Sequence, residues 1–170
     1  VILKFPEKKE EKLEEDDEFE DWGDEEKNDN KYWFTKDKIE TISNIHNYLD
    51  SLPEIGKVLS FSSIVDVATQ LNNNKPLGTL EMGVLYTKIP ENIKTEIIDP
   101  YISIKDNEAR ISLRIIDSKK DLKRNELIKK INNDLKNEFG LTEDRYKLAG
   151  VMILFNTVSY THLRAHETEA

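Results

Sequence analysis

The clearest structural signal in the sequence is the run Ala109-Arg110-Ile111-Ser112-Leu113-Arg114-Ile115, in which apolar and polar side chains alternate. Such alternation is typical of a β-strand with one face in the core. A shorter strand-like run, Tyr101-Ile102-Ser103-Ile104, precedes it, and the polar residues Lys105-Asp106-Asn107-Glu108 separate the two. A polar turn between two such runs predicts a β-hairpin.

Two amphipathic helices are predicted on either side of this hairpin. The first is expected between Thr35, a suitable N-cap, and Pro53, and its apolar residues recur at helical spacing: Ile39, Ile42, Ile45, Leu49 and Leu52. The second is expected between Ser118, which forms a capping-box pattern with Asp121, and Gly140. Its apolar residues are Ile128, Ile131, Leu135 and Phe139.

Three further strands complete the predicted fold. They are residues 1–5, which end at Pro6, residues 54–59, and a closing strand at 145–155. The order β-α-β-β-α-β is that of a split β-α-β, ferredoxin-like sandwich, so the predicted fold class is α+β. We expect both helices on one face of the sheet.

A helical insert is predicted at residues 61–98, between the second strand and the hairpin. Ser60 is a suitable N-cap for a helix that carries Ile64, Val65, Ala68 and Leu71 on one side. The polar residues 72–76 end this helix. One or two short helices should follow, because apolar residues recur at helical spacing until Pro90 interrupts them.

The acidic character of the chain is confined to one segment. Residues 7–27 hold 13 acidic and four basic side chains, which equals the net charge of −9 of all 170 residues. Because residues 7–31 contain few large apolar groups, we expect a disordered insertion there. It has no Asp-x-Asp-x-Asp-Gly spacing of the calcium-loop type. The rest of the chain is neutral overall and has no clustered basic face, so nucleic-acid binding is not expected.

Other function classes are also disfavoured by the residues present. The six glycines form no dinucleotide-binding or Walker pattern, no serine elbow occurs, and cysteine is absent. His46 has no second ligand at metal-binding spacing. No apolar run approaches the roughly 20 residues of a membrane-spanning helix. We therefore expect no enzymatic activity, no cofactor and no metal, and no membrane span within this chain.

The C-terminal tail, residues 157–170, is predicted to be non-native. Residues 158–168 read Val-Ser-Tyr-Thr-His-Leu-Arg-Ala-His-Glu-Thr, which is similar to a translation of a common transposon-based sequencing adapter. We expect native sequence to end near Asn156 and Val1 not to be a natural start. His162 and His166 have the i, i+4 spacing of a metal pair, but the adapter interpretation leaves them no such role.

A family resemblance comes from four segments that occur in order. They are Tyr32-Trp33-Phe34-Thr35, the run from His46 to Ser60 (HNYLDSLPEIGKVLS), the run from Ala109 to Ser118 (ARISLRIIDS) and the run from Leu148 to Asn156 (LAGVMILFN). They resemble the porter loops of resistance-nodulation-division (RND) exporters, in the branch with the hydrophobe exporters and the large mycobacterial lipid transporters. The resemblance covers residues 1–156, with a lean to the second of the two loops.

The resemblance implies one extracytoplasmic porter domain, residues 1–156, of an inner-membrane exporter driven by the proton-motive force. Its proton-coupling residues lie in membrane helices outside this chain, so no catalytic residue is assigned. Its partners would be a hydrophobic or lipid-like small molecule and the remainder of its own transporter, with an oligomeric assembly left open.

Large sites for apolar substrates are lined by apolar and aromatic side chains. The candidates for the substrate path, all in the helical insert, are Phe61, Met82, Leu85 and Tyr86. An ordinary core role is the commoner one for residues at helical spacing. The alternative function is a stand-alone ferredoxin-like interaction module without catalytic activity, because fold alone does not fix function.

Overall fold

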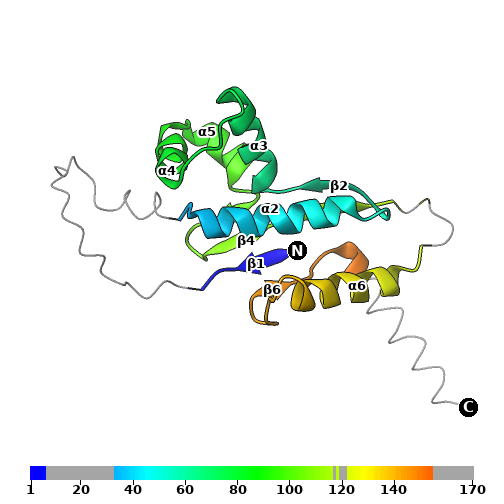
Figure 1. Cartoon of the computed structure of the whole chain (residues 1–170). Coiled ribbons are helices and arrows are strands. Elements are labelled where there is room, and N and C mark those ends of the chain that lie inside the picture. Colours follow the sequence, from blue (N-terminus) through cyan, green and yellow to red (C-terminus); the bar gives the residue numbers. More distant parts are fainter. Residues whose placement is uncertain (7–32, 117, 119–121, 155–170) are drawn as a thin grey trace, which may run out of the picture.

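The computed structural model describes residues 1–6, 33–116, 118 and 122–154. The predicted acidic insertion (7–31) and the adapter-like tail (157–170) lie outside these ranges. The described residues form helices and antiparallel strands, so the predicted α+β class is confirmed (Figure 1).

The strands form two antiparallel sheets in the described part of the chain. One has the order β3-β4-β1-β6 and the other pairs β2 with β5. The bounds are β1 (Ile2–Lys4), β2 (Ile55–Leu59), β3 (Ile102–Ser103), β4 (Glu108–Arg110), β5 (Ser112–Ile115) and β6 (Tyr146–Lys147). The predicted hairpin is confirmed, since Ile102 pairs with Ala109 and Ser103 with Glu108.

The strand predicted at 109–115 is interrupted at Ile111, where the two sheets meet. Residues before this point pair with β1, whereas those after it pair with β2. Ile111 is fully buried, and its N–H donates to the carbonyl of Val1 at 2.7 Å. The amino group of Val1 donates in return to the carbonyl of Ile111, also at 2.7 Å. One extended run of chain therefore takes part in both sheets.

Two long helices, α2 (Lys36–Ser51) and α6 (Arg124–Asn137), contact each other. The Tyr48 hydroxyl donates a hydrogen bond to the Asp134 carboxylate, and the Tyr48 and Phe139 rings lie 5.4 Å apart. The helices run side by side in opposite directions (Figure 1). Their buried residues are Ile42, Ile45, Leu49, Leu127, Ile131 and Leu135.

The first helix prediction is confirmed: α2 begins directly after Thr35, although the Thr35 side chain makes no capping hydrogen bond. The second is wrong at its start, because α6 begins after Lys123 and not after Ser118. The Lys123 backbone (φ −91°, ψ 85°) lies outside the helical region, which sets the later start. Gly140 follows the helix with φ +62°, the left-handed conformation expected for a C-terminal glycine.

The closing strand predicted at 145–155 is also wrong beyond Lys147. β6 comprises two residues, and residues 151–154 are helical. The cause is local: Gly150 has φ +137°, which residues with a side chain rarely adopt. The carbonyl of Gly150 then accepts hydrogen bonds from the N–H groups of Ile153 and Leu154, which turn the chain into a helix.

The segment 61–98 is built of α3 (Phe61–Leu71), α4 (Thr79–Lys88), α5 (Glu91–Ile93) and the π-helical turn η2 (Lys94–Ile98). The Ser60 hydroxyl accepts from the N–H of Ser62 at 3.1 Å, which confirms its predicted capping role. The Glu81 carboxylate accepts from the N–H of Gly78 at 2.8 Å and caps α4. Figure 1 shows these helices grouped together above α2.

Asn107 joins the two chain ends that border residues 7–32. Its side-chain oxygen accepts from Trp33 Nε1 at 2.9 Å and from Lys38 Nζ at 2.8 Å. Its side-chain nitrogen donates to the carbonyl of Phe5 at 2.9 Å. The Phe5 and Trp33 rings lie 5.9 Å apart. The chain thus leaves and re-enters the described fold at one place.

Deletion of residues 7–30 should leave the free energy of unfolding nearly unchanged, because the ends already lie together and the removed residues are mostly charged. Urea unfolding of the full and shortened chains measures the difference. A loss above about 2 kcal/mol would show that Leu13, Phe19 or Trp22 contributes to the core, against this expectation.

Truncation of a buried leucine should be costly. Leu135 and Leu49 are each 0 % exposed, so we expect Leu135→Ala or Leu49→Ala to lower the free energy of unfolding by about 2–5 kcal/mol. Leu71 is 82 % exposed and provides the matched control, since Leu71→Ala should change it by about 0.5 kcal/mol or less. Equal effects at buried and exposed positions would contradict this core.

Candidate functional site

The four candidates for the substrate path come together in the structure. Phe61, Met82, Leu85 and Tyr86 line one small cavity of about 20 Å³. A space of this size holds at most about one water molecule. Phe61 and Met82 are 3 % and 4 % exposed, so both occupy the core, while Leu85 is 39 % exposed. The four residues pack together without room for a substrate, and their place in a substrate path stays a prediction.

Phe34 lies at the centre of this packing. Its ring lies 5.4 Å from Phe61 of α3 and 5.0 Å from Tyr86 of α4. The Lys94 ammonium lies 4.7 Å from the centre of the Tyr86 ring, within the range of a cation–π contact. Burial, followed by the charges of Asp99 and Glu91, raises the pKa of Tyr86.

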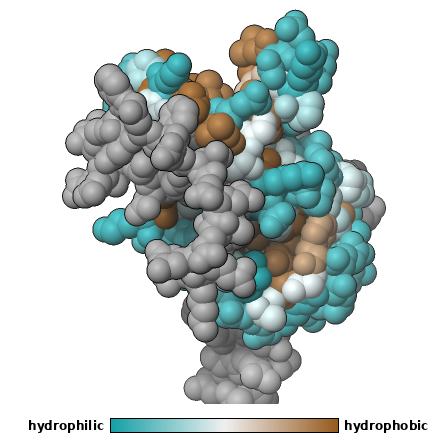
Figure 2. All heavy atoms as spheres, turned by 60° about the vertical axis from the view of Figure 1, so that its left-hand side comes forward, coloured by the Kyte–Doolittle hydropathy of each residue, from teal (hydrophilic) through white to brown (hydrophobic). Residues whose placement is uncertain are grey.

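Several large apolar side chains of these helices are exposed. Large apolar side chains exposed there, which we call the insert apolar surface, are Val67, Leu71, Leu80, Val84, Leu85, Ile93 and Ile97. Figure 2 shows apolar groups on the upper part of the molecule, where these helices lie. Where exposed apolar groups adjoin one another, they commonly mark contact sites for ligands, proteins or membranes.

Of these exposed residues, only Leu85 is predicted from the sequence to be a functional candidate. Leu71 is predicted to share one side of its helix with other apolar residues, and its side chain is 82 % exposed. One feature of the sequence indicates that apolar residues of this helix are exposed. Val67, together with Ile64, Val65 and Ala68, covers more than one helix face, and a helix of a small domain buries only one face.

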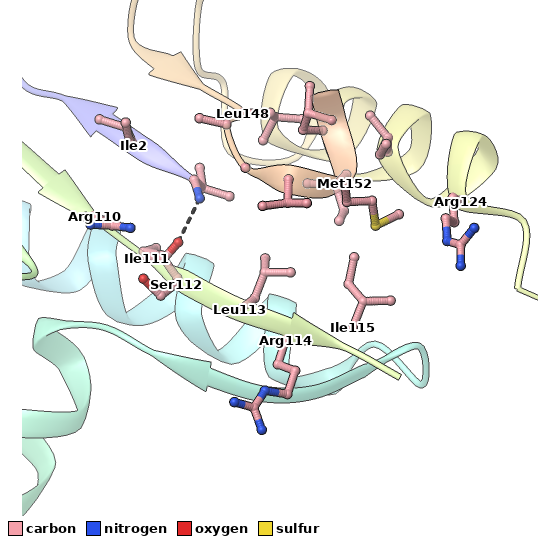
Figure 3. Close-up of a pocket in the computed structure, with 17 residues that line it drawn as sticks. Ile2, Arg110, Ile111, Ser112, Leu113, Arg114, Ile115, Arg124, Leu148 and Met152 are labelled. Carbon is pink, nitrogen blue, oxygen red and sulfur yellow. Dashed lines mark hydrogen bonds between the residues drawn. The ribbon is translucent and has the colours of Figure 1, made fainter. Parts of the chain in front are cut away.

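A larger groove of about 1080 Å³ lies between β5, α6 and residues 148–153 (Figure 3), and Val1 is among the residues that line it. We call it the β5 groove. Its apolar lining includes Leu113, Ile115, Ile128, Ile131 and Met152. The charged side chains that line it in the described residues are Arg110, Arg114 and Arg124. The groove is not predictable from local sequence patterns, because its walls come from segments far apart in the chain.

The amino group of Val1 is largely buried beside this groove. It donates to the carbonyl of Ile111 at 2.7 Å. Burial, and secondarily the positive charge of Arg110, lowers its pKa from the ordinary 8.0 to about 6. A charged ammonium is therefore disfavoured at this position.

The other polar groups singled out in the sequence have structural partners or lie outside the described ranges. His46 Nδ1 and the Ser60 hydroxyl form a hydrogen bond of 2.8 Å, which places His46 beside the N-cap of α3. His162 and His166 belong to the undescribed tail. In the residues that the structure describes, no group of three or more His, Cys, Asp or Glu is arranged to hold a metal ion.

The chain was compared with known protein families, curated proteins and solved structures. None of the three comparisons finds a match. None of the helices within the described ranges is both long and apolar enough to cross a bilayer. What the geometry itself defines is an α+β domain with an apolar helical surface and a separate groove beside β5.

Stability should rise with pH between about 6 and 8 because of the Val1 amino group. Below pH 6 the group is charged in both states, so folding buries a charge. Between pH 6 and 8 the unfolded chain retains the proton that the folded chain has lost, and stability rises by about 2 kcal/mol. Above pH 8 the group is neutral in both states.

The measurement is urea unfolding across this pH range, with the Nα-acetylated chain as the control. Acetylation removes the titrating group but leaves His46 and the carboxylates in place. The difference in stability between the acetylated and free chains should therefore shrink as the pH rises. A difference that is constant with pH would contradict the lowered pKa.

Proposed function

We propose that the fold is a ferredoxin-like split β-α-β sandwich with a helical insert at 61–98. The strand pairings support this. β6, β1, the β4–β5 run and β2 follow one another across the two sheets, and each neighbouring pair is antiparallel. α2 connects β1 to β2, and α6 connects β5 to β6, as that topology requires. The contact between α2 and α6 is consistent with one layer of helices.

On this fold we propose one extracytoplasmic porter loop of an RND-type membrane transporter, which exports hydrophobic or lipid-like substrates with the proton-motive force. The observation that carries the proposal is the insert apolar surface, which offers apolar contacts on a helical unit held by a packed aromatic core. The ordered resemblance of four segments to RND porter loops supports the same assignment.

The loop acts as one wall of the substrate path. Apolar substrates contact the exposed side chains of α3, α4 and the turns that follow, and rigid-body movement of the domain opens or closes the path. Proton coupling takes place at ionisable residues in the membrane helices of the intact transporter. The candidates Leu85 and Tyr86 lie where the insert apolar surface meets the aromatic core.

A stand-alone interaction module is the second candidate function. The same insert apolar surface favours it, since such surfaces also dock protein partners. The complete gene distinguishes the two functions. The transporter requires apolar segments of about 20 residues on both sides of this domain, and their absence would exclude it.

In the intact protein, replacement of Leu71 and Leu80 by Asn should lower export of a hydrophobic dye such as Nile red by about tenfold. Both side chains are exposed, at 82 % and 76 %, so the purified chain should keep its stability within about 0.5 kcal/mol. Export should also stop when the proton gradient is collapsed.

The matched control is Lys75→Asn, which changes an exposed polar side chain between the same two helices and should leave export unchanged. Unaltered export in the double leucine variant would contradict a role of the insert apolar surface in the substrate path. Export that survives collapse of the proton gradient would contradict the proposed energy source.

A further inference from the structure

The outer edge of β5 faces the β5 groove. In the described residues, β5 pairs with β2 along one edge only. In an antiparallel strand, successive residues direct their N–H and C=O groups to opposite edges. Ile111 directs both groups to Val1, on the side of β1. By this alternation Leu113 and Ile115 direct theirs to the same side, into the groove.

The pairing of β1 ends where the groove begins. Val1 is opposite Ile111, Ile2 is opposite Arg110 and Leu3 is opposite Ala109. An extension of β1 ahead of Val1 would therefore run along β5, with successive residues opposite Ser112, Leu113, Arg114 and Ile115. This direction leads into the open space between β5 and residues 148–153 (Figure 3).

The chain end at Val1 has the surroundings of a main-chain amide. Its nitrogen already makes the hydrogen bond that a strand amide would make, to the carbonyl of Ile111. An ammonium at this place is desolvated and lies near the positive Arg110. A peptide N–H would keep the hydrogen bond without burying a charge.

We propose that the β5 groove is the docking site of an extended polypeptide segment that continues β1 ahead of Val1 and pairs antiparallel with β5. The segment continues β1 and joins the two sheets into one, as in the addition of a strand to an open sheet edge. The proposal does not rest on the transporter assignment, because it requires only strand pairing beyond Val1.

The side chains of β5 define the pattern of this segment. In Figure 3, Leu113 and Ile115 point toward Met152, whereas Arg114 points away from it. Residues directly opposite each other in an antiparallel pair lie on the same face. The segment should therefore carry apolar side chains opposite Leu113 and Ile115, and polar or acidic ones opposite Ser112 and Arg114.

The test adds four residues ahead of Val1 in two orders. The sequence Val-Glu-Val-Thr places its valines opposite Leu113 and Ile115 and its glutamate opposite Arg114. The sequence Glu-Val-Thr-Val has the same composition but shifts every side chain to the wrong face. Both chains are released from a cleavable fusion so that no other residue precedes the extension.

The matched extension should slow hydrogen exchange at the amides of Leu113 and Ile115 by about tenfold or more relative to the unextended chain. It should also raise the melting temperature by about 5 °C relative to the Nα-acetylated unextended chain, which likewise has no ammonium at Val1. The shifted extension should give little protection, and its melting temperature should match that of the Nα-acetylated unextended chain, which also lacks the Val1 ammonium. Equal effects of the two extensions, or no protection by either, would overturn the proposal.

Two further measurements distinguish other occupants. Binding of the fluorescent fatty acid cis-parinaric acid to the unextended chain should be lost in the matched variant, or be absent from both. Equal binding to both chains would assign the groove to an apolar ligand and overturn strand docking. Amide protection that increases with the concentration of the unextended chain would assign the groove to a second copy, with the same consequence.

Discussion

The arrangement of the molecule depends on the burial of Phe34. This side chain is 1 % exposed and contacts Trp33 beside it, Phe61 on α3 and Tyr86 on α4. Each such aromatic pair contributes about 0.5–1.5 kcal/mol beyond the burial of its area. Phe34 directly precedes α2, which packs against β2, so the same ring links the helices of 61–98 to the sheets. These contacts attach the helices that carry the insert apolar surface to the rest of the described fold.

Charge contributes little to this arrangement. Ion pairs such as Lys123–Glu126 and Lys36–Glu40 have side chains that are at least 59 % exposed, and such pairs are worth about 0–1 kcal/mol. Buried polar groups are instead satisfied locally. Ser60 both caps α3 and bonds to His46, and no buried side-chain nitrogen or oxygen in the described residues lacks a partner. A mostly apolar interior with satisfied polar groups explains how so charged a sequence forms a defined fold.

Local sequence patterns predicted the elements that bury one face in the core, because burial of one face produces a regular spacing of apolar residues. The alternation around Ile111 predicted the hairpin, and the helical spacing of Ile42, Ile45 and Leu49 predicted α2 with its boundaries. The closing strand was predicted too long, because an apolar run has the same composition in a strand and in a helix, and the conformation of Gly150 decides between them. The exposure of Leu71 depends on whether another segment packs over it, which the helical spacing of α3 alone does not determine. The β5 groove likewise requires the contact between Val1 and Ile111, which no local window of sequence contains.

The position of β1 in the sheet has a consequence for folding during synthesis. β1 is made first, but its partners are Ala109 on one side and Tyr146 on the other. The sheet around β1 can therefore be completed only after β6, near the end of the described residues, has left the ribosome. Pairings of such large sequence separation fold slowly and leave strand edges open meanwhile. α2 and β2 contact each other directly and can assemble before β1 pairs with β4 and β6.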